Sequence, residues 1–364
     1  MRKLFVCLVA VMLCVALAAG ASAAGVTLRT FTPFADMDFS AQAYMDLITS
    51  WETETGNVVE DFSGLQDEAY MEQLRTMIDS GEADIVVVPA GLGLDGLVPV
   101  DELLAAAPDC GARRFPGISD GTPIRLNWEA LYVNKDVLDA NGLSVPRTFD
   151  ELVAVCAALS QKGILPIANA LCEWPEIVLD CAALLGAPED QYGQAASLDG
   201  AKNILATLTQ VGAFGSDPWN MEDLDAEAAF LSGQAAMRFD AYSLAQTIPA
   251  ERHASTLVIQ PAGKDGQPRT AVVGTPSFVL SMTRACFDDP ARREAALSLF
   301  KTLNTHAADL STDAAGSLGE SIARLTTSAT NCTGLLYDMN ADGFDSWSEG
   351  VVAALMSIQP SAMQ

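Results

Sequence analysis

The sequence predicts an α/β fold, and it does so most clearly between Pro123 and Ala170. The apolar run 130–133 is typical of a buried strand. The pair Thr148 and Glu151 has the spacing of a capping box at a helix start. Strands that alternate with helices in this way are typical of an α/β protein. Apolar residues continue the helix at helical spacing, at Leu152, Val155, Cys156 and Leu159.

The first ninety residues repeat the same alternation three times. Strands are expected at 26–31, from Val58, and at 85–88, where the β-branched run is typical of a parallel strand covered on both faces. The helices between them have apolar faces at 44–51 and 71–78. Three strand–loop–helix units predict a doubly wound sheet with right-handed crossovers.

Elements of both kinds continue after Ala170. A helix is expected to begin at Trp174–Pro175, and another covers 198–209. Further expected elements are a strand that ends near Asp240, strands at 256–260 and 271–281, and a helix through 295–303.

The N-terminus has the order of a secretory signal peptide. Arg2 and Lys3 precede an apolar run, and small residues follow it, so we expect residues 1–23 to be removed. The apolar run is short for a membrane span. A lipid anchor at Cys14 is disfavoured because Leu13 is not small, so we expect a protein released into the periplasm.

The mature chain is strongly acidic. With Arg2 and Lys3 removed, 18 basic residues remain against 47 acidic ones, a net charge of about −29. Binding to nucleic acid or anionic lipid requires Lys and Arg contacts, so we exclude both as partners. The acidity favours solubility, with a preference for cationic ligands as the alternative.

Six cysteines remain after the signal peptide. An even number in an exported protein permits disulfides, and we expect no more than two. The six cysteines are Cys110, Cys156, Cys172, Cys181, Cys286 and Cys332.

One segment resembles a known family. The order LYVNKDVLDANGLSVPRTFDEL followed by KGILPIANAL is similar to the extracellular solute-binding proteins of ABC importers, in the maltose-binding-protein branch of family 1. FLSGQAAM at 230–237 resembles another segment of that family. The resemblance implies a type II periplasmic-binding-protein fold with two discontinuous lobes joined by a hinge. The implied first lobe is 24–126 with about 270–305, and the second is 127–269 with about 306–364.

The resemblance also implies ligand-binding residues. Asn127 stands where the family has an acidic ligand contact near the hinge, and Tyr242 stands where it often has a stacking tryptophan. Aromatic rings at segment ends suit the apolar faces of sugars, although such rings also fill cores. The complete set expected to bind ligand is Asp36, Gln66, Asp67, Asn127, Trp128, Glu173, Trp174, Asp240, Tyr242 and Trp347.

The sequence supports catalysis and metal binding less well than it supports ligand binding. Two histidines, His253 and His306, offer too few partners for a histidine-based triad or a zinc site. The segment from Asp338 to Glu349 fits the fixed positions of an EF-hand loop, through Asp338, Asn340, Asp342 and Glu349. We favour a solvated loop there, with calcium as the alternative, and we expect no metal, no cofactor and no catalysis.

The sequence therefore predicts a monomeric, exported binding protein. Its expected ligand is a mono- or oligosaccharide, which it would deliver to ABC transporter permease subunits. A cationic solute such as a polyamine is the alternative ligand, and a secreted glycan hydrolase is the alternative from another class.

Overall fold

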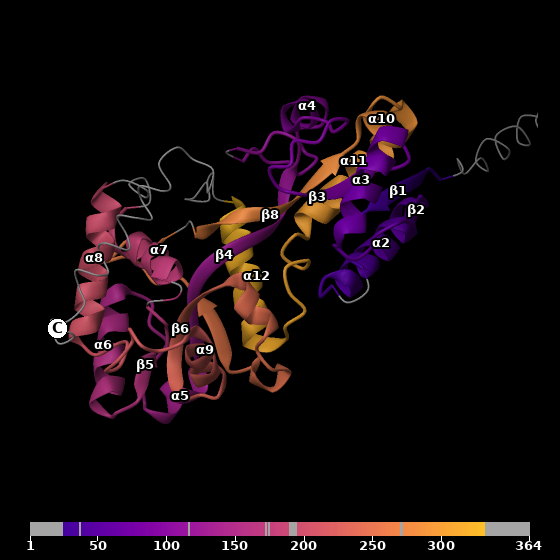
Figure 1. Cartoon of the computed structure of the whole chain (residues 1–364). Coiled ribbons are helices and arrows are strands. Elements are labelled where there is room, and N and C mark those ends of the chain that lie inside the picture. Colours follow the sequence, from indigo (N-terminus) through magenta and orange to yellow (C-terminus); the bar gives the residue numbers. More distant parts are fainter. Residues whose placement is uncertain are drawn as a thin grey trace, which may run out of the picture.

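The computed structural model describes residues 25–35, 38–115, 117–171, 173, 175–188, 195–269 and 272–331. These residues form one mixed sheet, flanked by helices, that runs through two lobes (Figure 1). The strand order is β2-β1-β3-β8-β4-β6-β5, and β7 pairs with β4 beside this path.

The first lobe begins with the three predicted strand–helix units. Strands β1 and β2 are parallel, and β1 is also parallel to β3, which confirms the expected parallel strands. Asp67 caps α3 by accepting a hydrogen bond from the Tyr70 amide at 2.9 Å. The lobe contains β1 (Thr27–Phe31), α2 (Ala41–Thr55), β2 (Val58–Asp61), α3 (Glu68–Ser80), β3 (Ile85–Pro89), α4 (Val100–Ala106), α10 (Arg284–Phe287) and α11 (Pro290–Thr305).

The second lobe is formed mainly by the middle of the chain. Thr148 caps α6 as predicted, accepting from the Glu151 amide at 3.2 Å, but the Glu151 carboxylate binds the amide of Arg147 and not that of Thr148. The lobe contains α5 (Lys135–Ala140), α6 (Phe149–Gln161), β5 (Leu165–Ile167), α7 (Pro175–Gly186), α8 (Ala195–Gln210), α9 (Asp223–Leu231), β6 (Ala235–Ala241), two 3₁₀ turns (Tyr242–Gln246 and Ala250–Arg252), β7 (Thr256–Ile259) and α12 (Gly316–Asn331).

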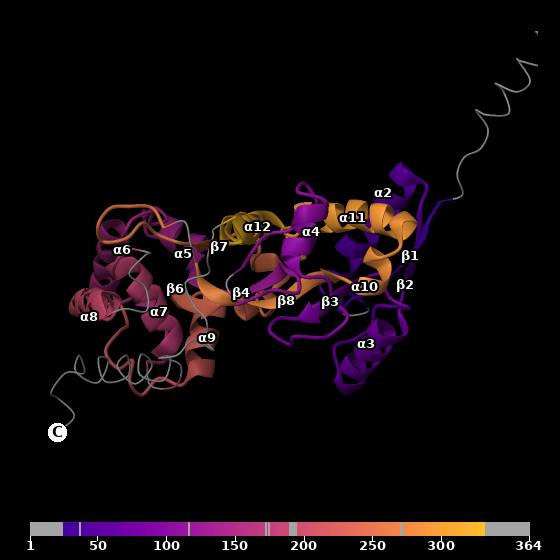
Figure 2. The ribbon, with the colours of Figure 1, turned by 90° about the horizontal axis from the view of Figure 1, so that it is seen from above.

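Two long antiparallel strands connect the lobes. β4 (Thr122–Asn134) and β8 (Val273–Met282) extend from one lobe to the other (Figure 2). β4 is longer than the predicted run at 130–133, because residues 122–129 pair with β8 before the strand enters the second lobe. A Cβ atom on Gly274 would lie 2.2 Å from the carbonyl oxygen of Asn127, so only glycine allows the two strands this approach.

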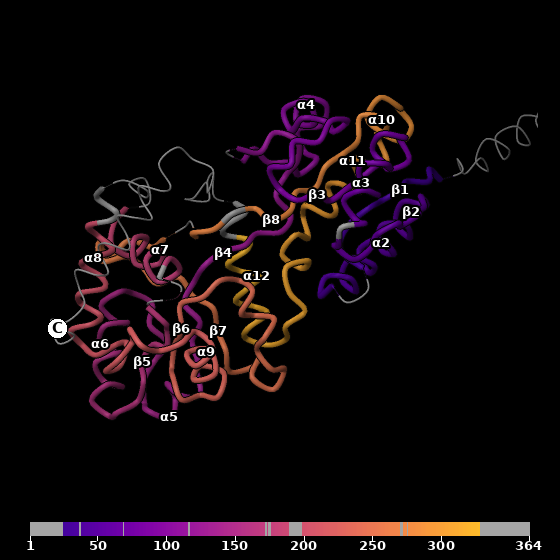
Figure 3. Tube along the Cα trace, in the orientation of Figure 1, coloured from indigo at the N-terminus to yellow at the C-terminus, as the bar shows by residue number. Residues whose placement is uncertain are grey.

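Each lobe has its own hydrophobic core. In the first lobe, residues of β1, β3 and α2 pack against residues of α11, and Trp51 is buried there as expected. In the second lobe, α6, α7 and α8 cover one face of the sheet, and Cys156 is fully buried among them. A further cluster packs α12 against the other face, around Trp128 and Tyr132. The path of the chain through these layers can be followed in Figure 3.

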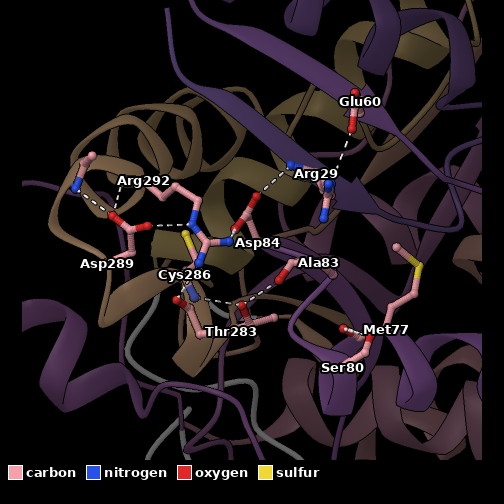
Figure 4. Close-up of polar contacts among 12 residues, drawn as sticks. Arg29, Glu60, Met77, Ser80, Ala83, Asp84, Thr283, Cys286, Asp289 and Arg292 are labelled. Atoms are coloured by element: carbon pink, nitrogen blue, oxygen red, sulfur yellow. Dashed lines mark hydrogen bonds and ion pairs between the residues drawn. The ribbon is translucent and has the colours of Figure 1, made fainter.

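Polar contacts connect the first lobe's two segments, which are some 200 residues apart. The buried carboxylate of Asp84 accepts hydrogen bonds from the Arg29 amide at 2.8 Å and from Arg292 Nη1 at 2.9 Å (Figure 4). The Thr283 hydroxyl donates to the carbonyl oxygen of Ala83 at 2.7 Å. These bonds hold the segment that follows β8 against β1 and β3.

Candidate functional site

The site is defined first by where the parallel strands end. Pro89, the last residue of β3, pairs with Phe278 of β8, and Phe278 pairs with Arg125 of β4. Ala241, the last residue of β6, pairs with Glu129 of β4. The carboxyl ends of β3 in the first lobe and β6 in the second therefore face each other along β4. They are separated by β4 residues 125–129, a span of roughly 13 Å at a strand rise of 3.3 Å per residue.

Asn127 lies at the middle of this junction. It is exposed, whereas residues 121–126 and Trp128 are buried. Ligands of open α/β sheets bind outside the carboxyl ends of the strands, where loops converge. The amide of Asn127 both donates and accepts hydrogen bonds, so this position suits a hydroxylated ligand.

Arg125 precedes Asn127 by two residues in β4, and its guanidinium is already neutralised. It donates to both carboxylate oxygens of Asp38, at 3.0 and 2.8 Å, and to the Ser40 hydroxyl at 2.6 Å. The rings of Phe39 and Phe34 lie against it, 4.4 and 4.9 Å from ring centroid to Cζ. This pairing leaves little positive charge for an anionic ligand at the junction.

Glu129 provides an acidic group two residues from Asn127. It is partly buried, and its Oε2 atom has no hydrogen-bond partner among the described residues. Burial raises the pKa of Glu129 well above its usual value, and nearby carboxylates, Asp180 first, raise this pKa further. A carboxyl group with a raised pKa can donate a hydrogen bond as well as accept one.

A chain of polar contacts joins two of the predicted ligand residues. The Glu173 carboxylate accepts from the amide of Asp223 at 2.7 Å, and Asp223 Oδ1 accepts from Arg238 Nη2 at 2.8 Å. Arg238 Nε donates to Asp240, which also accepts from the Ala241 amide at 2.7 Å. Glu173 and Asp240 are thus connected through a buried arginine at the carboxyl end of β6.

The structure separates the predicted residues into an exposed and a buried group. Gln66, Asp67, Asn127 and Glu173 are exposed, and Asp240 is largely buried in its ion pair. Trp128 is fully buried, and its indole nitrogen lies 3.4 Å from the Thr326 hydroxyl.

The Tyr242 ring packs at 5.2 Å against that of Trp128, and its hydroxyl donates to the Ser311 carbonyl. Both rings therefore belong to the core around α12, and their ligand role stays a prediction. Three further predicted residues, Asp36, Trp174 and Trp347, lie outside the described residues, as does the segment from Asp338 to Glu349.

The sequence reasoning overlooked two exposed apolar side chains. Phe62 and Leu65 follow β2 at its carboxyl end, with 43% and 53% of their surfaces exposed. The amide of Phe62 donates to the Thr30 carbonyl at 2.9 Å, so the backbone there is well held. An aromatic residue directly after a strand end was the signal that could have identified this ring.

Metal and thiol chemistry have no structural support in the described part of the chain. No group of three or more His, Cys, Asp or Glu side chains there could hold a metal ion. Of the six cysteines after residue 23, Cys110, Cys156, Cys181 and Cys286 are free and buried, and Cys172 and Cys332 lie outside the described residues. None of the four described cysteines therefore takes part in a disulfide with another of them. Among the helices that the structure describes, none has the length and apolarity needed to span a bilayer.

Two lobes that meet at facing strand ends define a two-lobed binding protein. Residues 40–309 match the family of bacterial extracellular solute-binding proteins, so the chain belongs to that family. The family assignment confirms the resemblance seen in the sequence. A Rhizobium meliloti (strain 1021) protein named "probable sugar-binding periplasmic protein" is 29% identical over 122 residues. That match spans 31% of this chain and 29% of the relative.

Solved structures show the same fold at low identity. RafE from Streptococcus pneumoniae is 15% identical with a TM-score of 0.62, over 92% of this chain and 94% of that one. A Streptomyces coelicolor protein described as a "probable secreted solute-binding lipoprotein" is 17% identical with a TM-score of 0.61, over 92% of this chain and 99% of that one. The bacterial solute receptor AcbH, described as exclusive for β-D-galactopyranose, is 13% identical with a TM-score of 0.59, over 94% and 98%.

Proposed function

We propose that this protein captures a mono- or oligosaccharide at the junction around Asn127 and delivers it to the permease of an ABC importer. The observation that carries the proposal is the meeting of two sets of strand ends at an exposed amide on the strand that joins the lobes. The sugar-binding name of the partial relative, and the galactose preference stated for AcbH, support this ligand class.

The chemistry of the junction suits a neutral, hydroxylated ligand. Asn127, Gln66 and Glu173 offer donors and acceptors, and Phe62 offers an aromatic face for the apolar side of a sugar ring. The pairing of Arg125 with Asp38 disfavours an anionic ligand. Micromolar affinity corresponds to about 8 kcal/mol, which several hydrogen bonds and one or two stacked rings can supply.

The two crossing strands suggest how binding is communicated. If the lobes close over the ligand by bending β4 and β8, the ligand stabilises the closed state because only that state contacts it from both lobes. A permease can then recognise the closed shape.

The proposal also covers export, oligomeric state and the boundaries of the two lobes. We propose removal of residues 1–23 on export, a monomer in the periplasm, and no catalysis. We also propose lobes of 24–126 with about 270–305, and of 127–269 with about 306–364. The separate core clusters in the two lobes support this division.

The proposal is tested by thermal-shift screening of the mature protein with sugars, amines and calcium. Saturable stabilisation by one or more sugars is expected. Stabilisation by polyamines alone would redirect the proposal to cationic solutes, and a flat response to the whole sugar panel would refute it. Release of a cleaved product from a glycan would establish the hydrolase instead.

A further inference from the structure

Glu129 lies on the face of β4 that borders the candidate site. Alternate residues of a strand point to the same face, so Asn127, Glu129 and Leu131 share one face. Asn127 is exposed at the junction, and Leu131 is buried in the core formed with α6, α7 and α8. Glu129 lies between them and is partly exposed, roughly 7 Å along the strand from Asn127. Its carboxyl group is therefore within reach of a ligand that binds at Asn127.

The carboxyl group of Glu129 has no partner in the protein itself. Its Oε2 atom is covered and accepts no hydrogen bond, and neither oxygen forms an ion pair within the described residues. The arginines of β4 and β6, Arg125 and Arg238, are already paired with aspartates. A covered, unpartnered polar atom is costly, so a ligand that satisfies it gains affinity.

The surroundings of Glu129 favour its neutral, protonated form. Ala241 of β6 and Val273 of β8 pair with it and carry no charge. Burial raises the pKa of Glu129 well above its usual value, and the nearby carboxylates raise this pKa further. Burial also raises the pKa of the neighbouring thiol, which stays neutral. These titratable neighbours are Glu176, Asp180 and Cys181 of α7 and Asp240 of β6.

We propose that Glu129 contacts the bound sugar as a neutral carboxylic acid, which donates a hydrogen bond to a ligand oxygen, and that loss of this proton weakens binding. The inference rests on the proposed function, because it assigns a role within the same site. A protonated carboxyl group both donates and accepts, so it can pair with a sugar hydroxyl in either direction.

The closed state should hold this proton more tightly than the open state. Closure of the lobes over a sugar removes further water from Glu129, and desolvation disfavours the ionised carboxylate. Because binding and protonation then favour each other, the affinity for sugar should fall as the pH rises through the pKa of the empty site.

Calorimetric titration of the mature protein at pH 5, 7 and 9 tests this role. The probe is whichever of galactose, glucose, maltose and raffinose gives the largest thermal shift. E129Q replaces the O–H donor by an N–H donor and cannot ionise, whereas E129M removes the donor at similar length. E320Q is the matched control, because Glu320 is exposed on α12 of the same lobe.

We expect the sugar affinity of the parent protein to fall at least fivefold from pH 5 to pH 9, and that of E320Q to fall equally. E129Q should bind within twofold at all three pH values, and E129M should bind at least tenfold more weakly than the parent at pH 5. Parallel pH profiles in the parent and E129Q, or equal affinity in the parent and E129M at pH 5, would overturn the inference and leave the proposed function intact. Absence of binding by all four sugars would refute the proposed function, and this inference with it.

Discussion

The guanidinium of Arg125 and the carboxylate of Asp38 form a two-pronged ion pair at the base of the junction, at 3.0 and 2.8 Å. The pair joins the strand that crosses between the lobes to the loop after β1, 87 residues earlier. Both side chains are largely buried, with 11% and 16% of their surfaces exposed. The pair therefore positions the entrance to β4 and neutralises the arginine nearest the candidate site.

Breaking this pair should destabilise the protein substantially. D38N leaves the buried Arg125 charge without its partner, and such changes cost about 3 kcal/mol. Urea denaturation followed by fluorescence measures the free energy of unfolding. D101N is the matched control, because Asp101 pairs with Arg114 on the surface at 76% and 71% exposure. The control should lose less than about 1 kcal/mol, and an equal loss in both variants would contradict the role given to Asp38.

Removing the Phe62 ring should weaken sugar binding without loss of stability. The ring is 43% exposed at the carboxyl end of β2, so F62A sacrifices little core packing. We expect about tenfold weaker binding, equivalent to about 1.4 kcal/mol. M45A is the matched control, since Met45 is an apolar side chain with 44% exposure on α2. Unchanged affinity in F62A would remove this ring from the site.

The raised pKa of Glu129 predicts that the stability of the protein depends on pH. Its pKa is raised above the usual 4.5 by burial, so the folded protein holds its proton more tightly than the unfolded chain. This contribution to stability is complete below pH 4.5 and is lost as the pH rises toward the folded-state pKa. E129Q keeps the shape without the ionisation, so its advantage in unfolding free energy over the parent should grow from pH 4.5 to pH 8. Urea denaturation across this range measures it, with exposed E72Q as control, and parallel curves for parent and E129Q would contradict the assignment.

The buried thiols should be unreactive in the folded protein. Burial raises the pKa of Cys156 to about 12, and burial likewise raises those of Cys181 and Cys286. A thiol reagent should therefore label these cysteines only after denaturant is added. Mass spectrometry of labelled peptides identifies the sites, and rapid labelling of any of the three in native buffer would be inconsistent with the structure.

Much of the fold follows from local signals in the sequence. The strand and helix positions up to Pro89 match because apolar periodicity, caps and glycines agree at each element, as at Asp67 and Gly56. β4 was predicted short because residues 122–129 lack a continuous apolar run, and their pairing with β8 depends on contacts about 150 residues apart.

The site was harder to predict, because sequence position does not reveal which way a side chain points. Trp128 and Asn127 are adjacent in β4, yet the alternation of a strand buries the first and exposes the second. The pairing of Arg125 with Asp38 is likewise a tertiary contact without a local signal. Phe62 directly follows β2, and neither apolar periodicity nor spacing distinguishes an exposed ring there from a buried one.

The most direct test of the central claim is calorimetric titration of the best-stabilising sugar into N127A. Asn127 is exposed at the junction, so its loss should weaken binding at least tenfold while the free energy of unfolding stays within about 0.5 kcal/mol. N203A, an exposed asparagine on α8, is the matched control and should bind as the parent protein does. Equal sugar affinity in the parent, N127A and N203A would contradict a binding site at this junction.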